Sequence, residues 1–155
     1  MNGAKTAAAN KWLIVAGGLS AAAAILHLAV IAGGADWYRF FGAGEEMARM
    51  AEAGSPVPAI VTLGIALILA IWAAYAFAGA GLLRRLPLMR TALLIIATIY
   101  LARGLVLVPT LLMKPELVDA FMLWSSLIVL VYGATYAVGT WRAWPALSQR
   151  PYAPA

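Results

Sequence analysis

An arginine inside an apolar segment is the first candidate for chemistry in this chain. Arg103 lies in the run of residues 91–109, about three residues past its midpoint. A guanidinium within a bilayer costs about 2.5–3.5 kcal/mol on insertion scales, so such an arginine faces neighbouring helices and has a partner. The partner is either a carboxylate of the same chain, from Asp119 or Glu116, or an anionic ligand such as a lipid phosphate. The sequence leaves both interpretations open.

The single histidine of the chain, His27, lies in another apolar run, residues 12–33. It stands about four residues past the midpoint of that run, which predicts nearly the same membrane depth as that of Arg103. A histidine in a membrane span usually hydrogen-bonds a neighbouring helix, yet an imidazole can also gain and lose a proton near neutral pH. His27 is therefore either a structural residue or a proton-transfer group.

Further polar residues complete a predicted polar patch. Ser126 lies in the apolar run of residues 120–141, near the level of Arg103, and two acids precede that run. A serine in a span usually hydrogen-bonds its own helix or a neighbouring one, and no GxSxG motif surrounds this one, so a nucleophilic role is not expected. We identify no catalytic residue. The predicted ligand-binding residues are His27, Arg103, Glu116, Asp119 and Ser126.

Composition excludes several other kinds of site. The chain has no cysteine, which excludes disulfides, thiolate nucleophiles and iron–sulfur clusters. One histidine alone cannot supply a bis-histidine haem or a metal site that needs two imidazoles. We therefore predict no metal site, and the residues point to no particular cofactor.

The segments that carry these residues are those of an integral membrane protein. The chain has 155 residues, of which 65% are hydrophobic and 11% charged, a composition far from that of soluble domains. Four apolar runs, residues 12–33, 57–83, 91–109 and 120–141, are close to the roughly 20 residues that a helix needs to cross a bilayer. We predict an all-α bundle of four transmembrane helices. It forms one membrane domain over residues 1–145, followed by a disordered tail over residues 146–155.

The charged residues indicate topology rather than nucleic-acid binding. The net charge is +5, yet all six acids fall in the two connections on one predicted side of the membrane. Because short cytoplasmic flanks collect lysine and arginine, we predict that both termini are cytoplasmic. The expected location is the cell membrane, which is the inner membrane in a Gram-negative bacterium. The basic residues on the predicted cytoplasmic side are Lys5, Lys11, Arg84, Arg85, Arg90, Arg142 and Arg150.

A cleaved signal peptide is the alternative interpretation of the first run. Lys5 and Lys11 precede that run, and a GGA sequence that a signal peptidase could cleave stands at residues 33–35. However, residues 12–33 exceed the roughly 7–15 residues of a signal-peptide hydrophobic region. This length favours a retained first span, whereas cleavage would leave three helices.

The first predicted outer connection, residues 34–56, carries an interfacial segment. Residues 45–53 place Met47, Met50 and Ala51 on one helical face and four charged residues on the other. We expect a short amphipathic helix that lies flat on the outer surface. The aromatic sequence DWYRFF precedes it, and its rings are expected at the level of the lipid headgroups. The predicted interfacial residues are Trp37, Tyr38, Arg39, Phe40 and Phe41.

Two functions are compatible with these features. We expect a non-enzymatic protein whose polar patch holds an amphiphilic ligand with an anionic head, or a partner subunit, with Arg103 beside the head. The alternative is a membrane-embedded enzyme or transporter in which His27 moves a proton and Arg103 fixes an anionic substrate. Expected partners are membrane lipid, a hydrophobic or amphiphilic small molecule, and a second copy of the chain or another membrane subunit. Nucleic acid is not expected.

Overall fold

The structure is built from helices, most of them long and apolar. It is a computed structural model that describes residues 9–148, and within that range it contains no strand. Among the described residues, four helical stretches are long and apolar enough to cross a membrane: α1, α3, α4 with α5, and α6. The prediction of an all-helical chain with four membrane-crossing stretches is confirmed at this level. The elements are α1 (Lys11–Phe40), α2 (Glu45–Glu52), α3 (Val57–Gly79), α4 (Met89–Leu105), α5 (Leu107–Met113), the 3-10 helix η1 (Pro115–Leu117) and α6 (Ala120–Ser148).

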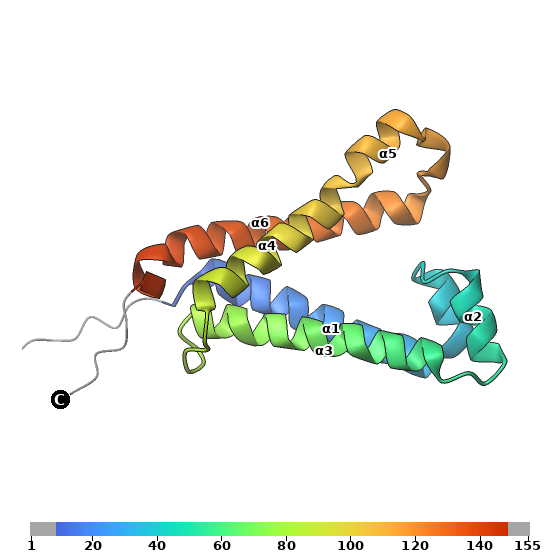
Figure 1. The fold of residues 1–155 in the computed structure, drawn as a ribbon, viewed down its shortest axis with the longest axis horizontal. Coiled ribbons are helices and arrows are strands. Elements are labelled where there is room, and N and C mark those ends of the chain that lie inside the picture. The colour runs from blue at the N-terminus through green and yellow to red at the C-terminus, as the bar shows by residue number, and fades with distance from the viewer. Residues whose placement is uncertain (1–8, 149–155) are drawn as a thin grey trace, which may run out of the picture.

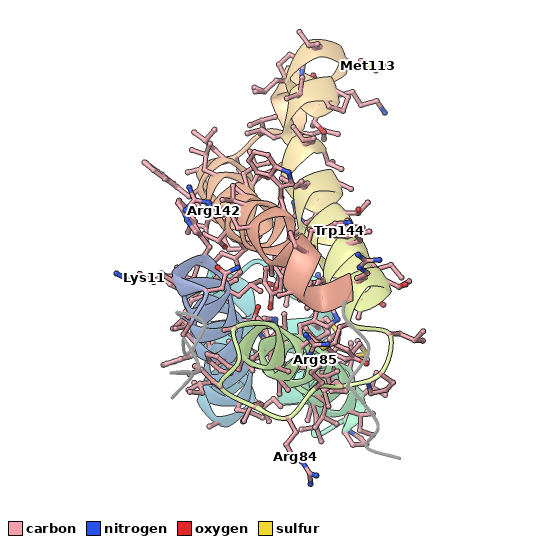
Figure 2. All side chains as sticks on the ribbon, turned by 90° about the vertical axis from the view of Figure 1, so that its left-hand side faces the viewer. Lys11, Arg84, Arg85, Met113, Arg142 and Trp144 are labelled. Carbon is pink, nitrogen blue, oxygen red and sulfur yellow. The ribbon has the colours of Figure 1, made fainter. Side chains whose placement is uncertain are left out.

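The four long stretches form two antiparallel pairs that converge at one end of the molecule (Figure 1). Helix α1 packs along α3, and α4 packs along α6. The pairs lie close together near the α3–α4 connection and diverge toward the end that carries α2 and α5. The converging end presents Lys11, Arg84, Arg85 and Arg142 (Figure 2). We call it the basic end, and we call the opposite end, where the six acids lie, the acidic end.

Three buried hydroxyl groups join the two helix pairs. The Ser20 hydroxyl of α1 lies 3.0 Å from the Tyr100 hydroxyl of α4 and 2.9 Å from the Tyr136 hydroxyl of α6. Tyr136 also donates to the carbonyl oxygen of Trp72 in α3, at 3.0 Å. Ser20 and Tyr136 are fully buried. Because a buried polar group without a partner is destabilising, this hydroxyl cluster of Ser20, Tyr100 and Tyr136 fixes how the four long helices meet.

The donor and the acceptor of each hydrogen bond in the hydroxyl cluster can be assigned, because each hydroxyl carries one hydrogen. A carbonyl oxygen only accepts, so Tyr136 donates to Trp72 and must accept from Ser20. Ser20 in turn accepts from Tyr100. The rings pack as well, since Tyr100 meets the Trp72 indole edge-on at a centroid distance of 4.9 Å. The hydrogen bonds therefore link all four helices, and the ring contacts add to the packing of α3, α4 and α6.

The start of α1 is tied to α6 near the basic end. Asn10 is the N-cap of α1, and its side-chain oxygen accepts from the backbone N–H groups of Trp12 and Leu13, at 3.1 and 3.3 Å. The side-chain amide of Asn10 donates to the carbonyl oxygen of Gly139 in α6 at 2.7 Å. A Cβ on Gly139 would lie 2.8 Å from the Leu13 side chain, so the glycine allows the two helices to approach closely. Asn10 thus both caps the start of α1 and attaches this helix to α6.

Two predicted spans contain breaks that their hydropathy does not indicate. Helix α1 continues past residue 33 to Phe40, with Gly34 at a φ of 69° and a ψ of −152°. Glycine adopts this positive φ at little cost, so the aromatic segment expected in a loop forms the end of α1 after a kink. The third span is divided at Val106 into α4 and α5. Pro109 explains this break, because it has no N–H group for the Leu105 carbonyl.

The remaining boundaries differ by a few residues. Helix α3 ends at Gly79 rather than at residue 83, and α6 continues past residue 141 to Ser148. Residues 146–148, which were expected in the tail, are therefore helical. The rest of the predicted tail, residues 149–155, lies outside the described residues.

Removing the hydroxyl of Tyr136 tests the hydroxyl cluster. Tyr136→Phe leaves the Ser20 hydroxyl hydrogen without its buried acceptor, so we expect the free energy of unfolding to fall by about 1–3 kcal/mol. Tyr132→Phe is the matched control, because Tyr132 contributes its ring to the cluster and no hydroxyl hydrogen bond within residues 9–148. Unfolding in mixed micelles of increasing dodecyl sulfate, followed by circular dichroism, measures both variants. Equal losses would contradict the role given to the hydroxyl.

Candidate functional site

Arg103 lies beside Ser126, where α4 and α6 pack closely. One terminal nitrogen of Arg103 donates to the Ser126 hydroxyl at 3.4 Å. Ser126 is fully buried, whereas Arg103 is exposed on the isolated chain. The close packing depends on Gly104, because a Cβ there would lie 2.5 Å from Leu130 and 3.0 Å from the Ser126 carbonyl oxygen. The glycine next to Arg103 therefore brings α6 within reach of the guanidinium.

No carboxylate lies at ion-pairing distance from Arg103 within residues 9–148. Asp119 has a different role: its side chain accepts from the backbone N–H of Met122 at 2.6 Å and caps the start of α6. Glu116 is exposed in η1. The structure therefore contains no salt bridge between Arg103 and either of these two acids. In the part of the chain that the structure describes, the hydrogen-bond partner of the guanidinium is the hydroxyl of Ser126.

His27 lies on the face of α1 that is directed toward the other helix pair. It follows Ser20 by seven residues, close to two full turns, so it shares the face of Ser20 and lies about 10 Å nearer the acidic end. The side chain is half-buried, and its Nδ1 lies 2.8 Å from the Ala23 carbonyl oxygen. Since a carbonyl only accepts, Nδ1 carries the hydrogen of this bond. No hydrogen bond within the described part of the chain links His27 to Arg103.

The structure thus brings together two of the predicted ligand-binding residues. Arg103 and Ser126 are in contact, whereas the hydrogen bond of His27 is to the backbone of its own helix, α1. Of the two acids, Glu116 lies in η1 and Asp119 caps the start of α6. The equal depth of His27 and Arg103 that the sequence predicts stays a prediction, because the two helix pairs diverge at this level.

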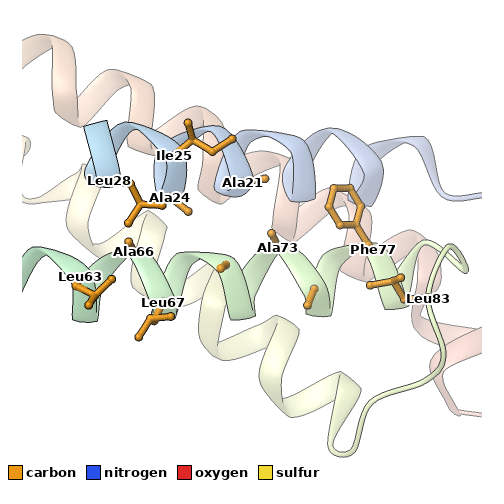
Figure 3. A pocket seen from close by; sticks show the side chains of 12 residues that line it. Ala21, Ala24, Ile25, Leu28, Leu63, Ala66, Leu67, Ala73, Phe77 and Leu83 are labelled. Atoms are coloured by element: carbon orange, nitrogen blue, oxygen red, sulfur yellow. The ribbon is translucent and has the colours of Figure 1, made fainter. Parts of the chain in front are cut away.

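Two apolar grooves lie along the seam between α1 and α3. The larger has a volume of about 450 Å³ and is lined by small and aliphatic side chains such as Ala24, Leu28 and Leu63 (Figure 3). The second, of about 410 Å³, shares Leu28 and Leu63 with it and continues toward Pro56. None of the predicted ligand-binding residues lines either groove. These apolar grooves are therefore separate from the contact between Arg103 and Ser126.

Arg39 is the centre of a second charged site. The sequence predicted this residue only as one member of an aromatic interfacial segment. Two nitrogens of Arg39 donate to the two carboxylate oxygens of Glu45, at 2.8 and 3.0 Å. Arg39 also donates to Glu52 at 2.8 Å and lies 3.5 Å from Asp36. Glu45 and Glu52 are the first and last residues of α2. The Arg39 cluster, formed by these four residues, therefore fixes both ends of α2 to the end of α1.

Tyr38, which was predicted as an interfacial residue, is buried in apolar packing beneath the Arg39 cluster. Tyr38 is 2% exposed and packs with Val30 of α1 and Ala48 of α2. Trp37 and Phe40 are exposed, as expected of rings that meet the membrane surface. The predicted helix exists as α2, and its apolar face packs against the end of α1. Tyr38 is therefore a core residue of this end.

The sequence did not indicate the hydroxyl cluster as a special feature. Tyr100, Tyr132 and Tyr136 are ordinary packing residues by composition, and Ser20 stands among alanines. Which helices pair, and at which level, decides whether these hydroxyls meet. The only available signal was that a tyrosine hydroxyl in an apolar span needs a partner.

The attachment of α2 should weaken in acid. The hydrogen bonds and charge of Arg39 lower the pKa of Glu45 from 4.5 to about 2 and also lower the pKa of Glu52. A carboxylate with a lowered folded-state pKa stabilises the attachment above pH 4.5, and this contribution is lost as the pH falls toward 2. A fluorophore on Ala53→Cys, in a chain with no other cysteine, reports this as falling anisotropy below pH 4.5.

Arg39→Gln in the same labelled chain is the control for this titration. Without the guanidinium, Glu45 and Glu52 lose the largest cause of their lowered pKa together with their link to α1, and we expect low anisotropy already at neutral pH with little further change. If the variant and the parent gave the same pH profile, Arg39 would not be the group that holds α2.

Comparison with known proteins identifies no relative of this chain. No protein-family model, no curated protein and no solved structure matches the chain. Its function has to be inferred from its own residues and their geometry.

Proposed function

We propose that this protein is a non-enzymatic membrane protein that holds an amphiphile with an anionic head, and that Arg103 binds the head. The observation that carries the proposal is the incomplete pairing of Arg103. Its guanidinium has five N–H donors and one charge, and Ser126 supplies a single hydroxyl at 3.4 Å. In an apolar medium such a charge is costly unless an anion balances it.

The surroundings of Arg103 favour an amphiphile over a soluble anion. Leu105 follows it on α4, Val106 lies at the break after α4, and Leu123 and Leu127 flank Ser126 on α6; all four are exposed on the isolated chain. A ligand whose head reaches Arg103 would place its apolar part against these side chains. A phosphate or carboxylate head matches the forked donors of a guanidinium. A carboxylate of a partner subunit would offer the same chemistry, and the experiment below separates it from a lipid.

The alternative function uses His27 for proton transfer. The observation in its favour is the Nε2 atom, which can accept a proton while Nδ1 stays bonded to the Ala23 carbonyl. No second proton-transfer group contacts this ring among the described residues. The binding function therefore remains our first proposal.

We also propose an orientation in the cell membrane, with the basic end in the cytoplasm and α2 at the outer surface. The basic bias supports it, because the acids lie at the other end of the molecule. The exposed rings of Trp37 and Phe40 beside α2 support a position of that helix at the headgroup level.

A reporter enzyme that is active only in the cytoplasm tests the orientation. We expect activity when it is inserted after Arg84, in the basic α3–α4 connection, and silence when it is inserted after Glu46 in α2. A fusion at the C-terminus should be active and serves as the control for expression. Activity of the insertion in α2 would reverse the proposed orientation.

Native mass spectrometry of protein released in a mild detergent tests the binding function. We expect the parent to carry an amphiphile, and we expect Arg103→Met to reduce its occupancy at least about tenfold, since charged hydrogen bonds of this kind are worth 1.5–3 kcal/mol. Arg49→Met removes a cation at the same end, where Arg49 lies 3.4 Å from Glu45, and should leave occupancy unchanged.

His27→Gln separates the two functions in the same experiment. It keeps a polar side chain, so the bound amphiphile should remain. Retained ligand with a lost proton flux in reconstituted vesicles would instead favour the enzyme or transporter. A parent that carries no amphiphile, or that carries a second protein chain in its place, would contradict the proposed ligand.

A further inference from the structure

We propose that the amphiphile held at Arg103 has hydroxyl groups on its head, and that these donate to backbone carbonyl oxygens left free by the break between α4 and α5. The inference rests on the proposed function, because it names the class of head group that the Arg103 site selects. That class is a phospholipid whose singly charged phosphate carries a polyol such as glycerol.

Backbone carbonyl oxygens at the break are the first observation. The carbonyl of Val106, the residue between α4 and α5, accepts from the Thr110 backbone N–H at 3.2 Å and from the Thr110 hydroxyl at 2.8 Å. In contrast, the carbonyls of Arg103 and Leu105 accept no hydrogen bond across the break within residues 9–148. Two acceptors inside a membrane-crossing stretch therefore lack a donor from the described chain.

Pro109 keeps the Leu105 carbonyl free. In a continuous helix this carbonyl would accept from the N–H of residue 109, but proline has none, and its ring crowds the carbonyl four residues before it. Leu105 is also exposed on the isolated chain. Backbone acceptors at membrane depth need a partner, because hydrocarbon offers no donor. A donor from a bound molecule would supply what the break lacks.

Arg103 provides donors within one turn of these acceptors. Its guanidinium has five N–H groups, and its partner among the described residues is the Ser126 hydroxyl at 3.4 Å. A head with a phosphate alone would satisfy the guanidinium, whereas a phosphate that carries hydroxyl groups would satisfy the carbonyls as well. An ammonium head would also donate to the carbonyls, but it would bring a second positive charge close to Arg103. The combination therefore favours an anionic polyol.

The direction of α5 gives the side from which the head approaches. Beyond the break α5 diverges from α6 (Figure 1). Val108 on α5 and Leu123 on α6 are both exposed on the isolated chain. We therefore expect the head to reach the carbonyls where these two helices part.

Titration of the delipidated parent protein with lipids of identical chains tests the inference by native mass spectrometry. Phosphatidylglycerol and phosphatidylethanol carry the same single negative charge, but only the glycerol head has hydroxyl groups. We expect phosphatidylglycerol to be retained at least about threefold more, which corresponds to one net hydrogen bond. Phosphatidylethanolamine should be retained less than phosphatidylglycerol, and Arg103→Met should reduce retention of both anionic lipids.

Pro109→Ala tests the role of the break. It returns an N–H group to the Leu105 carbonyl and removes the ring, so the preference for phosphatidylglycerol over phosphatidylethanol should fall toward equality. Retention of phosphatidylethanol should stay within about twofold, because the charge of Arg103 is unchanged. Pro115→Ala is the matched control: it removes a proline from η1, outside the break, and should keep the preference.

The outcomes separate this inference from the proposed function. Equal retention of the two anionic lipids by the parent, with both lost in Arg103→Met, would overturn the role of the carbonyls and leave the proposed function intact. Retention of neither lipid, or no effect of Arg103→Met, would contradict both.

Three further results would also overturn the inference. The first is a preference that persists in Pro109→Ala, and the second is stronger retention of phosphatidylethanolamine. The third is displacement of phosphatidylglycerol by glycerol phosphate at equal concentration, which would replace the lipid by a soluble anion. The lipid comparison on the parent needs no variant, so it decides even if Pro109→Ala fails to fold.

Discussion

The hydrogen bonds of Ser20, buried where the four long helices meet, are the constraint on which the rest of the arrangement depends. A serine hydroxyl deep in an apolar bundle must find partners, and Tyr100 and Tyr136 supply them from the other helix pair. Tyr136 extends the connection to the backbone of α3. Because this junction holds the two pairs together from its level to the basic end, the pairs can diverge beyond it (Figure 1).

That divergence decides the surroundings of the arginines toward the acidic end. Arg103 lies one turn beyond Tyr100, and among the described residues it hydrogen-bonds Ser126 and forms no ion pair. Arg39 occupies Glu45 and Glu52, and the side chain of Asp119 caps α6. Arg39, near the surface, is thus fully paired. Arg103, within a span, is incompletely paired among the described residues. This contrast is the physical basis for assigning an anionic ligand to Arg103.

The sequence predicted the four spans, because hydropathy and length alone determine which segments can cross a bilayer. It also predicted a helix at α2 and the positions of Arg103 and His27 within apolar runs. It could not predict the kink at Gly34 or the break at Val106, since a glycine or proline in a span permits a break without requiring one. The contact of Arg103 with Ser126 and the burial of Tyr38 depend on how helices rotate and pair, which hydropathy does not specify.

A double-mutant cycle between Arg103 and the two nearest candidate acids tests the central claim, that Arg103 has no carboxylate partner in its own chain. The cycle combines Arg103→Met with Glu116→Gln and Asp119→Asn, of which the last preserves helix capping. Measured as free energy of unfolding in detergent micelles, the effects should add to within about 0.5 kcal/mol. A coupling of about 1 kcal/mol or more would mean that Arg103 is paired with one of these acids, and the anionic ligand would no longer be needed.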